Sequence, residues 1–428
     1  MSTDLAEAVV DLAAVRGNLA TIAAGTPARI LAVVKADGFG HGAVPIARAA
    51  LAAGAAWLGV TSATEALALR ADGITAPILS WLHRPDADVT ALILADVDIS
   101  VSTVAHLRRV AADAARCGRV AHVHLKADTG LHRNGATSDD WPELLAWTRK
   151  HEHEGTLRCR AIWSHLATAD QPPKTTPTLE DLVLNAPAPT GSGPIAAAPG
   201  FSASDPAAPK IDATLEELLL NAAAPGDAGA PGSAGVARQR AAFVAAVAEA
   251  RAAGLTPELA HLANSAAAMT APDTHFDLVR IGIGLYGIEP VPGRVTGLRP
   301  ALTVRTSVIN IKRVPAGSGV SYGPDHVTTR PTSLALLPIG YADGLPRAAE
   351  GRAQVVIAGR RCPIVGRIAM DQCVVDVGDL PVGLGDTAIV LGTGGPSATE
   401  WAAWAGTNPH EILTGIGPRV TRTYLHGE

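Results

Sequence analysis

The feature that most constrains the fold is an alternation repeated along the first 285 residues. Short apolar runs rich in β-branched residues alternate with alanine-rich stretches of helical character, such as 42–53, 104–116 and 237–253. Eight apolar runs in this arrangement predict an α/β fold built on a parallel (β/α)8 barrel of the TIM type. The predicted strands cover residues 29–34, 56–60, 77–82, 97–101, 121–127, 157–166, 258–265 and 278–285.

Beyond residue 290 the pattern changes to prolines, glycines and short β-rich runs such as ALTVRTSVINI and AQVVIAG. This pattern predicts a mainly β C-terminal domain over residues 291–428 that follows a barrel domain over residues 1–290. The boundary is expected between residues 288 and 300. A chain of 428 residues is long enough for two such domains.

Residues 171–236 fit neither domain, because they consist largely of Pro, Ala, Gly, Ser and Thr. Such a composition buries too little apolar surface to order itself, so we expect a flexible insertion in the barrel. Within it TLEDLVLN (178–185) returns as TLEELLLN (214–221), which predicts two short amphipathic helices. A local tandem duplication explains this repeat more simply than a docking motif does.

The composition argues against several classes of partner. The 35 basic residues nearly offset the 40 acidic ones, and neither sign forms blocks, so we expect no binding of nucleic acid or membrane. The chain has no apolar run of membrane-spanning length and no N-terminal signal peptide, which predicts a cytoplasmic protein with a small-molecule ligand. Its four cysteines lack the paired spacing of a zinc site, so we expect no metal and interpret all four as small core residues.

Polar residues gather at the predicted strand ends, where the active sites of such barrels lie. Each alone fits an ordinary polar residue at a strand end, but together they predict one site. Asparagine and serine after the seventh strand, with a glycine in the eighth, are typical of a phosphate site. A lysine at the same rim, followed by small residues that leave space for a ring, suggests covalent attachment of pyridoxal phosphate. The residues are Lys35 after the first strand, Lys126 and Arg133 at the fifth, His165 at the sixth, Asn264 and Ser265 at the seventh, and Arg280, Gly282 and Ile283 within the eighth.

Eight motifs in order strengthen this interpretation. They are VVKADGFGHG, HLKADTGLHRNG, SHLATAD, LANSAAA, VRIGIGLYG, VSYG, GYADGLPR and GRIAMDQ. The series resembles that of the alanine racemases, two-domain enzymes of fold type III that use pyridoxal 5'-phosphate. The resemblance covers nearly the whole chain except residues 171–236.

The resemblance implies a mechanism with two catalytic bases. Lys35 would bond to the cofactor and act as one base, and Tyr322 from the partner subunit of a homodimer would act on the opposite face of the substrate. Arg280 would face the pyridine nitrogen and, since a guanidinium donates but cannot accept a proton, would keep that nitrogen unprotonated. His165 would bridge Tyr322 and Arg280 and help the phenol react near neutral pH.

The resemblance also implies roles in binding. Arg133 would contact the cofactor's phenolic oxygen and the substrate carboxylate, and Lys126 matches a carbamylated lysine whose anion holds that arginine. The cofactor phosphate would be held by Ser265, Gly282, Ile283 and Tyr341, while Met370 and Asp371 would line the substrate entrance from the partner chain.

Two features depart from the family pattern. Phe39 stands where the family usually has a tyrosine whose hydroxyl reaches the phosphate. A lost hydrogen bond to a charged group is worth roughly 1.5–3 kcal/mol if nothing replaces it. The second departure is the insertion at 171–236, which follows the rim residue His165.

The resemblance implies interconversion of L- and D-alanine, which supplies D-alanine for peptidoglycan. A racemase of serine or of many amino acids stays open as an alternative. A non-catalytic carrier of pyridoxal phosphate is disfavoured because such proteins resemble the barrel alone. A fold-type III decarboxylase is disfavoured because SHLATAD and GRIAMDQ match the racemases.

Overall fold

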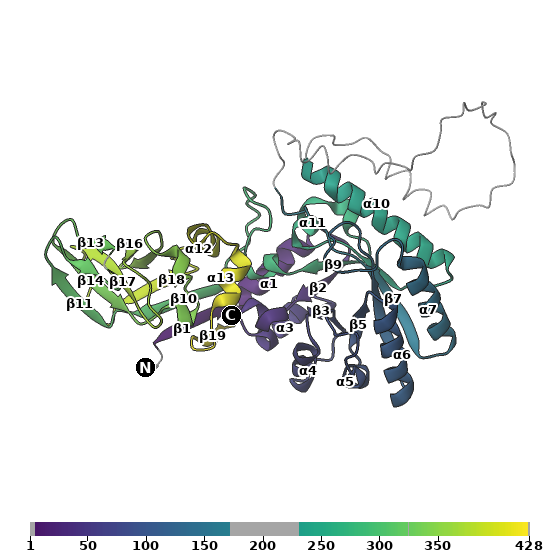
Figure 1. Cartoon of the computed structure of the whole chain (residues 1–428). Helices are drawn as coiled ribbons and strands as arrows, with labels where there is room; N and C mark the ends of the chain where they lie inside the picture. The colour runs from purple at the N-terminus through teal and green to yellow at the C-terminus, as the bar shows by residue number, and fades with distance from the viewer. Residues whose placement is uncertain (1–4, 172–230, 324, 427–428) are drawn as a thin grey trace, which may run out of the picture.

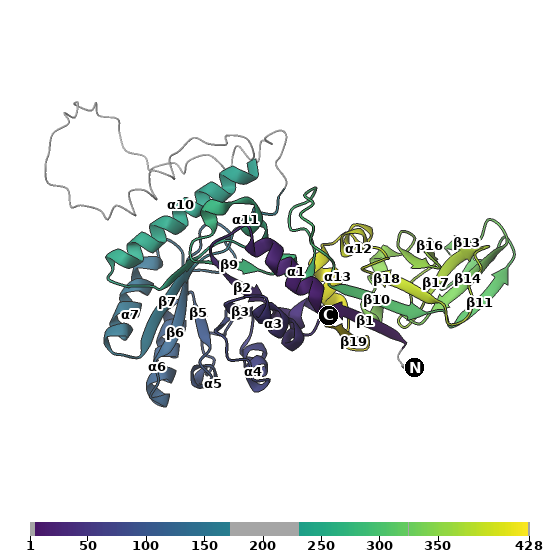
Figure 2. The same ribbon diagram turned by 180° about the vertical axis from the view of Figure 1, so that it is seen from behind.

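The computed structural model describes residues 5–171, 231–323 and 325–426 of the chain. It contains an α/β barrel and, beside it, an elongated β-rich part that extends away from the barrel (Figures 1 and 2). Helix α1 (Leu12–Ala23) lies where these two parts meet in both views. The predicted barrel with a mainly β C-terminal part is therefore confirmed.

The barrel is a parallel sheet of eight strands in the order β8-β7-β6-β5-β4-β3-β2-β9. The first and last strands of this order, β8 and β9, are joined by two hydrogen bonds that close the barrel. They run from Asp277 N to Ala260 O at 3.1 Å and from Arg280 N to Ala263 O at 3.0 Å. Each observed strand overlaps a predicted one, although all eight are shorter than predicted. The strands are β2 (Arg29–Val33), β3 (Trp57–Val60), β4 (Ile78–Ser80), β5 (Asp98–Val101), β6 (Ala121–Lys126), β7 (Leu157–Trp163), β8 (Leu259–His261) and β9 (Leu278–Ile281).

Helices follow the strands around the outside of the barrel, and local signals set their ends. Ser62 and Glu65 form a reciprocal capping box at the start of α4, and Gly118 ends α6 in the left-handed conformation. The further helices of this part are α2 (Lys35–Phe39), α3 (Ala43–Ala52), α4 (Ala63–Ala71), α5 (Thr90–Leu94), α6 (Val104–Cys117), α7 (Trp141–His153), α10 (Pro231–Ala252) and α11 (Ser265–Thr270), with short 3-10 turns η1 (Pro272–Thr274) and η2 (Ile283–Tyr286).

The expected insertion is shorter at its C-terminal end than predicted. Helix α10 begins at Pro231 rather than near residue 237, so residues 231–236 belong to a barrel helix. The run PGSAGV was assigned to the insertion because it is rich in Pro, Gly, Ser and Ala. A proline is nevertheless tolerated in the first turn of a helix. The repeats at 178–185 and 214–221 lie outside the described residues.

The β-rich part is built on a nine-stranded sheet in the order β11-β14-β17-β16-β15-β18-β10-β1-β19. A small hairpin, β12 (Gly319–Val320) with β13 (His326–Val327), accompanies it. The sheet strands are β1 (Ala6–Asp11), β10 (Leu302–Ser307), β11 (Asn310–Val314), β14 (Thr332–Leu337), β15 (Gln354–Ile357), β16 (Arg360–Val365), β17 (Cys373–Gly378), β18 (Thr387–Leu391) and β19 (Thr421–Leu425). Helices α12 (Ala398–Ala405) and α13 (Pro409–Gly415) and 3-10 turns η3 (Tyr341–Asp343) and η4 (Arg347–Ala349) complete this part.

Strand β1 is an element that the sequence analysis did not predict. It pairs antiparallel with β10 and parallel with β19, and buried Ala6, Ala8 and Val10 alternate with partly exposed residues along it. The expected barrel domain, residues 1–290, includes this strand, but the structure places it in the nine-stranded sheet. The first and last strands of the described residues, β1 and β19, are thus neighbours in the same sheet.

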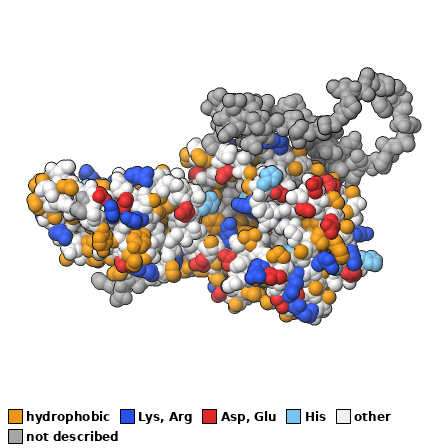
Figure 3. Space-filling view, in the orientation of Figure 1, with side chains coloured by type: hydrophobic (Ala, Val, Ile, Leu, Met, Phe, Trp, Pro, Cys, Tyr) orange, Lys and Arg blue, Asp and Glu red, His pale blue; other side chains and the backbone are white. Residues whose placement is uncertain are grey.

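Burial agrees with the cysteine prediction in three of four cases. Cys159, Cys362 and Cys373 are buried, whereas Cys117 near the end of α6 is only partly buried. Acidic and basic side chains are intermixed on the face shown in Figure 3. Among the described residues, no helix is both long and apolar enough to cross a bilayer.

Candidate active site

Lys35 begins a turn with unusual backbone geometry directly after strand β2. Ala36, Asp37, Gly38 and Phe39 all have φ between 51° and 60°, in the left-handed region. For a residue other than glycine this conformation costs about 1–2 kcal/mol. The carboxylate of Glu65 accepts hydrogen bonds from the backbone N–H groups of Ala36 at 2.7 Å and of the loop before α4, which ties the turn to the next βα unit.

Two glycines of this turn pack against the C-terminal segment of the chain. A Cβ at Gly40 would clash with the carbonyl of Leu413 in α13, and a Cβ at Gly42 would clash with the hydroxyl of Tyr424 in β19. The small residues were expected to leave space for a cofactor ring. Gly40 and Gly42 also leave space for the C-terminal segment of the chain.

Positive groups gather at the carboxyl ends of the strands. Burial is the main cause that lowers the pKa of Lys35, with a further contribution from the charge of Arg133. Lys126, the last residue of β6, is 5% exposed and its Nζ lies 4.4 Å from the centre of the Trp163 ring. Burial, followed by the charges of Arg280 and Arg133, lowers the pKa of Lys126 to about 8.

Arg280 on β9 is held by several acceptors. Its Nη2 donates to the carbonyl oxygens of Ser164 at 2.8 Å and Leu262 at 2.9 Å, and lies 3.2 Å from Nδ1 of His165. Burial lowers the pKa of Arg280 to about 9, so it is still charged at neutral pH. Burial and then the charge of Arg280 hold the pKa of His165 well below its usual value, so this imidazole is neutral.

The structure brings together the residues predicted to bind phosphate from the barrel. Ser265 Oγ accepts from Gly282 N at 2.9 Å, and Ile283 begins the 3-10 turn η2 beside it. Gly282 and Ile283 were predicted within the eighth strand, but that strand ends at Ile281. Asn264 caps helix α11 by accepting from Ala267 N at 3.0 Å, so its side-chain oxygen is already engaged.

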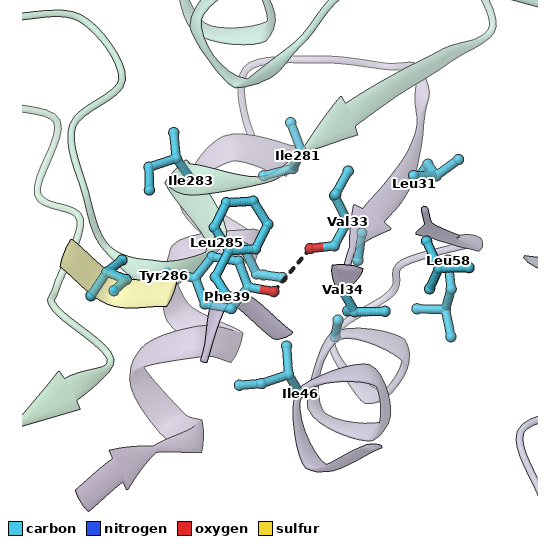
Figure 4. Close-up of a cluster of buried hydrophobic side chains, with 14 of the residues drawn as sticks. Leu31, Val33, Val34, Phe39, Ile46, Leu58, Ile281, Ile283, Leu285 and Tyr286 are labelled. Carbon is cyan, nitrogen blue, oxygen red and sulfur yellow. Dashed lines mark hydrogen bonds between the residues drawn. The ribbon is translucent and has the colours of Figure 1, made fainter. Parts of the chain in front are cut away.

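Phe39 lies against this group in an apolar cluster, shown in Figure 4. Its ring is stacked on that of Tyr286, with centroids 4.6 Å apart, and the Tyr286 hydroxyl donates to Val33 O at 2.9 Å. The Cζ atom of Phe39 would lie 3.3 Å from a Cβ built on Gly282. A para hydroxyl on this ring would therefore project toward Gly282.

Arg133 is exposed, in the loop after β6. Asp128 shapes this loop, because its carboxylate accepts from the backbone N–H groups of Gly130, Leu131 and His132 at 3.0–3.1 Å. The guanidinium is close enough to lower the pKa values of Lys35, Lys126 and His165.

The predicted residues of the β-rich part do not join this group within one chain. Tyr322 is 71% exposed and lies in the turn between β12 and β13. Strand β13 lies at the end of the β-rich part away from the barrel (Figures 1 and 2). Tyr341 and Met370 are also exposed and lie on adjoining segments, since Tyr341 N donates to Ala369 O at 3.0 Å. Asp371 forms an ion pair with Arg419 at 2.7 Å.

Several residues around the site were missed by the sequence analysis. Glu65 was missed because nothing local marks it apart from its capping position in α4. His261 lies four residues before Ser265, and His124 lies two residues before Lys126, so strand periodicity would have placed His124 on the same face of β6 as that lysine.

Comparisons with known proteins agree with this arrangement. The family model described as "Alanine racemase, N-terminal domain" matches residues 10–184 and 218–290, and "Alanine racemase, C-terminal domain" matches residues 301–424. The gap at 185–217 falls inside the expected insertion.

Relatives and solved structures with this name match nearly the whole chain. An alanine racemase of Frankia casuarinae is 43% identical over 98% of this chain and 96% of its own length, and one of Mycobacterium tuberculosis is 43% identical over 99% and 97%. The crystal structure of alanine racemase from Streptomyces lavendulae has a TM-score of 0.83 at 41% identity and covers 100% of this chain and 99% of its own. That of Streptomyces coelicolor A3(2) has a TM-score of 0.82 at 39% identity, with 98% of both chains covered. The chain belongs to the alanine racemase family.

Proposed function

We propose that the protein is an alanine racemase that interconverts L- and D-alanine with pyridoxal 5'-phosphate and thereby supplies D-alanine for peptidoglycan. One observation carries the proposal: an amine of lowered pKa, Lys35, lies at the strand ends of the barrel with the buried cations Lys126 and Arg280. Their mutual repulsion is relieved by an anionic ligand. The cofactor phosphate and the substrate carboxylate are such anions.

The described residues fit this cofactor. Lys35 is the residue to which it would bond, because a lowered pKa leaves more of the amine in its neutral, nucleophilic form. Ser265, Gly282 and Ile283 would hold the phosphate, and Arg280 would donate to the ring nitrogen. When bound, pyridoxal phosphate withdraws electrons from the Cα–H bond of an amino acid and so makes its proton removable.

Racemisation requires a base on each face of the substrate. Lys35 would exchange the Cα proton on one face, and Tyr322 of the partner subunit on the other. Because His165 is neutral and its Nδ1 faces an Arg280 donor, its proton lies on Nε2. This N–H would donate to the phenolic oxygen of the partner's Tyr322 and favour the phenolate.

The exposed position of Tyr322 supports a homodimer with shared sites. Its side chain is 71% exposed in the β12–β13 hairpin, and β13 lies at the end of the β-rich part away from the barrel (Figures 1 and 2). Met370 is 53% exposed. A two-fold axis that brings this surface of one chain to the barrel of another generates two equivalent sites. In such a dimer Met370 and Asp371 would line the substrate entrance of the partner's barrel, and Tyr341 beside them would reach the partner's phosphate site rather than that of its own chain.

The match of a C-terminal racemase model to residues 301–424 supports a racemase over a non-catalytic carrier. Substrate range stays open between alanine alone and a wider set that includes serine. A chiral assay over several amino acids separates these two.

We expect the purified protein to equilibrate L- and D-alanine and to absorb visible light from bound cofactor. Borohydride should fix the cofactor on Lys35, and Lys35→Ala should lower the racemisation rate by at least about 1000-fold, the scale of a lost catalytic base. Peptide mass mapping and chiral chromatography measure these outcomes. A label on another lysine would contradict the proposed role of Lys35.

We also propose that Lys126 is carbamylated and that its carbamate holds Arg133. Only the neutral amine reacts with CO₂, and a pKa of about 8 leaves roughly a tenth of the amine neutral at pH 7, far more than an ordinary lysine. At fixed CO₂ pressure, carbamylation should increase as the pH rises through 8. Labelling with ¹³CO₂ should give a carbamate signal in the ¹³C NMR spectrum that Lys126→Gln lacks, and an unchanged signal in that variant would contradict this assignment.

Phe39→Tyr should strengthen retention of the cofactor. The added hydroxyl would project toward Gly282, in the proposed phosphate site, and a hydrogen bond to a charged group slows dissociation about tenfold or more. Dialysis against a carbonyl scavenger measures the rate of loss. Equal or faster loss would mean that the pocket is rebuilt around the phenyl ring.

Sharing of the site is tested by mixing two inactive variants, Lys35→Ala and Tyr322→Phe. After the two are unfolded together and refolded, heterodimers have one doubly defective and one intact site. Random pairing should restore about a quarter of the wild-type activity. Verified heterodimers without recovered activity would show that both residues act within one chain.

A further inference from the structure

A chain of hydrogen-bonded side chains extends from Arg280 through the interior of the barrel. Arg280 Nη1 lies 3.1 Å from Nδ1 of His261, and Nε2 of His261 lies 3.1 Å from Nδ1 of His124. His124 Nε2 lies 2.9 Å from Oδ2 of Asp98, whose other oxygen accepts from Arg160 at 2.9 Å. Four of these five side chains are almost completely buried, with exposures between 0% and 4%.

This series of hydrogen-bonded side chains crosses the barrel from one end to the other. Asp98 is the first residue of β5, whereas His261 is the last residue of β8 and Arg280 lies near the end of β9. His124 lies in the middle of β6 and connects the two levels. The carboxylate therefore lies at the opposite end of the barrel from the proposed cofactor site.

Because Arg280 can only donate and the Asp98 carboxylate can only accept, the hydrogen bonds between them all run in one direction. A guanidinium can only donate, so His261 must accept at Nδ1 and carry its proton on Nε2. His261 then donates to Nδ1 of His124, whose proton also lies on Nε2 and is donated to the Asp98 carboxylate, which only accepts. Both imidazoles are thus neutral, in agreement with burial and the charge of Arg280, which hold the pKa of His261 well below its usual value.

We propose that Asp98 and His124 are positioning residues for Arg280, and that they act by holding His261 in the one tautomer that accepts from the guanidinium. This proposal deepens the proposed function and rests on it only for the effect on catalysis. With His261 fixed, Arg280 keeps its proton and its orientation toward the cofactor ring. Without the Asp98 carboxylate, the direction of hydrogen-bond donation along His124 and His261 can reverse. His261 would then present an N–H to the Arg280 N–H groups.

The protonation pattern can be tested without any variant. Neutron diffraction from deuterium-exchanged crystals of the holoenzyme should show deuterium on Nε2 of both His124 and His261 and none on Nδ1. Deuterium on Nδ1 of either ring would overturn the proposal. This test does not depend on which reaction the enzyme catalyses, so it distinguishes failure of the proposed positioning from failure of the proposed function.

The effect on catalysis is tested with Asp98→Asn, which removes the charge and allows either direction. The turnover number per bound cofactor should fall about tenfold or more, the size typical of residues that orient a directly acting group. KM for alanine should change little, because Arg280 faces the cofactor rather than the substrate.

Asp113→Asn is the matched control. Asp113 is equally buried and pairs with Arg109 at 3.0 Å and Arg116 at 2.7 Å, but on helix α6 outside the barrel. This variant should lose thermal stability and keep its turnover number. Equal turnover numbers in the two variants, whether unchanged or reduced, would overturn the proposal. If Asp98→Asn does not fold, the deuterium positions on His124 and His261 in the wild-type protein test the proposal.

Discussion

The buried guanidinium of Arg280 is the interaction on which the arrangement of the site depends. A buried charge costs several kcal/mol unless its donors are satisfied. The carbonyl oxygens of Ser164 and Leu262, just after β7 and β8, supply acceptors, and His165 and His261 supply two more. Satisfying one cation therefore fixes how the ends of three neighbouring strands lie relative to one another.

This arrangement leaves the rim with more positive charge than the described residues neutralise. Arg280 and Arg133 both lower the pKa of Lys126, and Asp128 opposes them only in part. Such a cluster is expensive without an anion and suits a ligand that carries a phosphate and a carboxylate. The electrostatics of the rim thus favour an anionic ligand, as the proposed cofactor and substrate would supply.

Much of the barrel and of its rim was predictable from sequence. Hydrophobic periodicity located all eight strands, and the rule that active sites lie at strand ends selected Lys35, Lys126 and Arg280. Strand β1 was not predictable in this way, since its six residues acquire their role from pairing with β10 and β19, almost 300 and more than 400 residues away. Contacts of this kind, like the His261–His124–Asp98 chain, depend on which strands become neighbours.

The Lys35 turn shows how the two parts of the fold depend on each other. Gly40 and Gly42 make room for Leu413 and Tyr424, and Arg422 Nε donates to the carbonyl of Gly40 at 3.1 Å. The left-handed backbone after Lys35 is therefore held by residues near the C-terminus as well as by Glu65. Because β19 is itself paired with β1, the strand that leads into α1 beside the barrel, the position of Lys35 depends on both ends of the chain. The β-rich part thus supports Lys35, the proposed point of cofactor attachment, in addition to presenting side chains to a proposed partner.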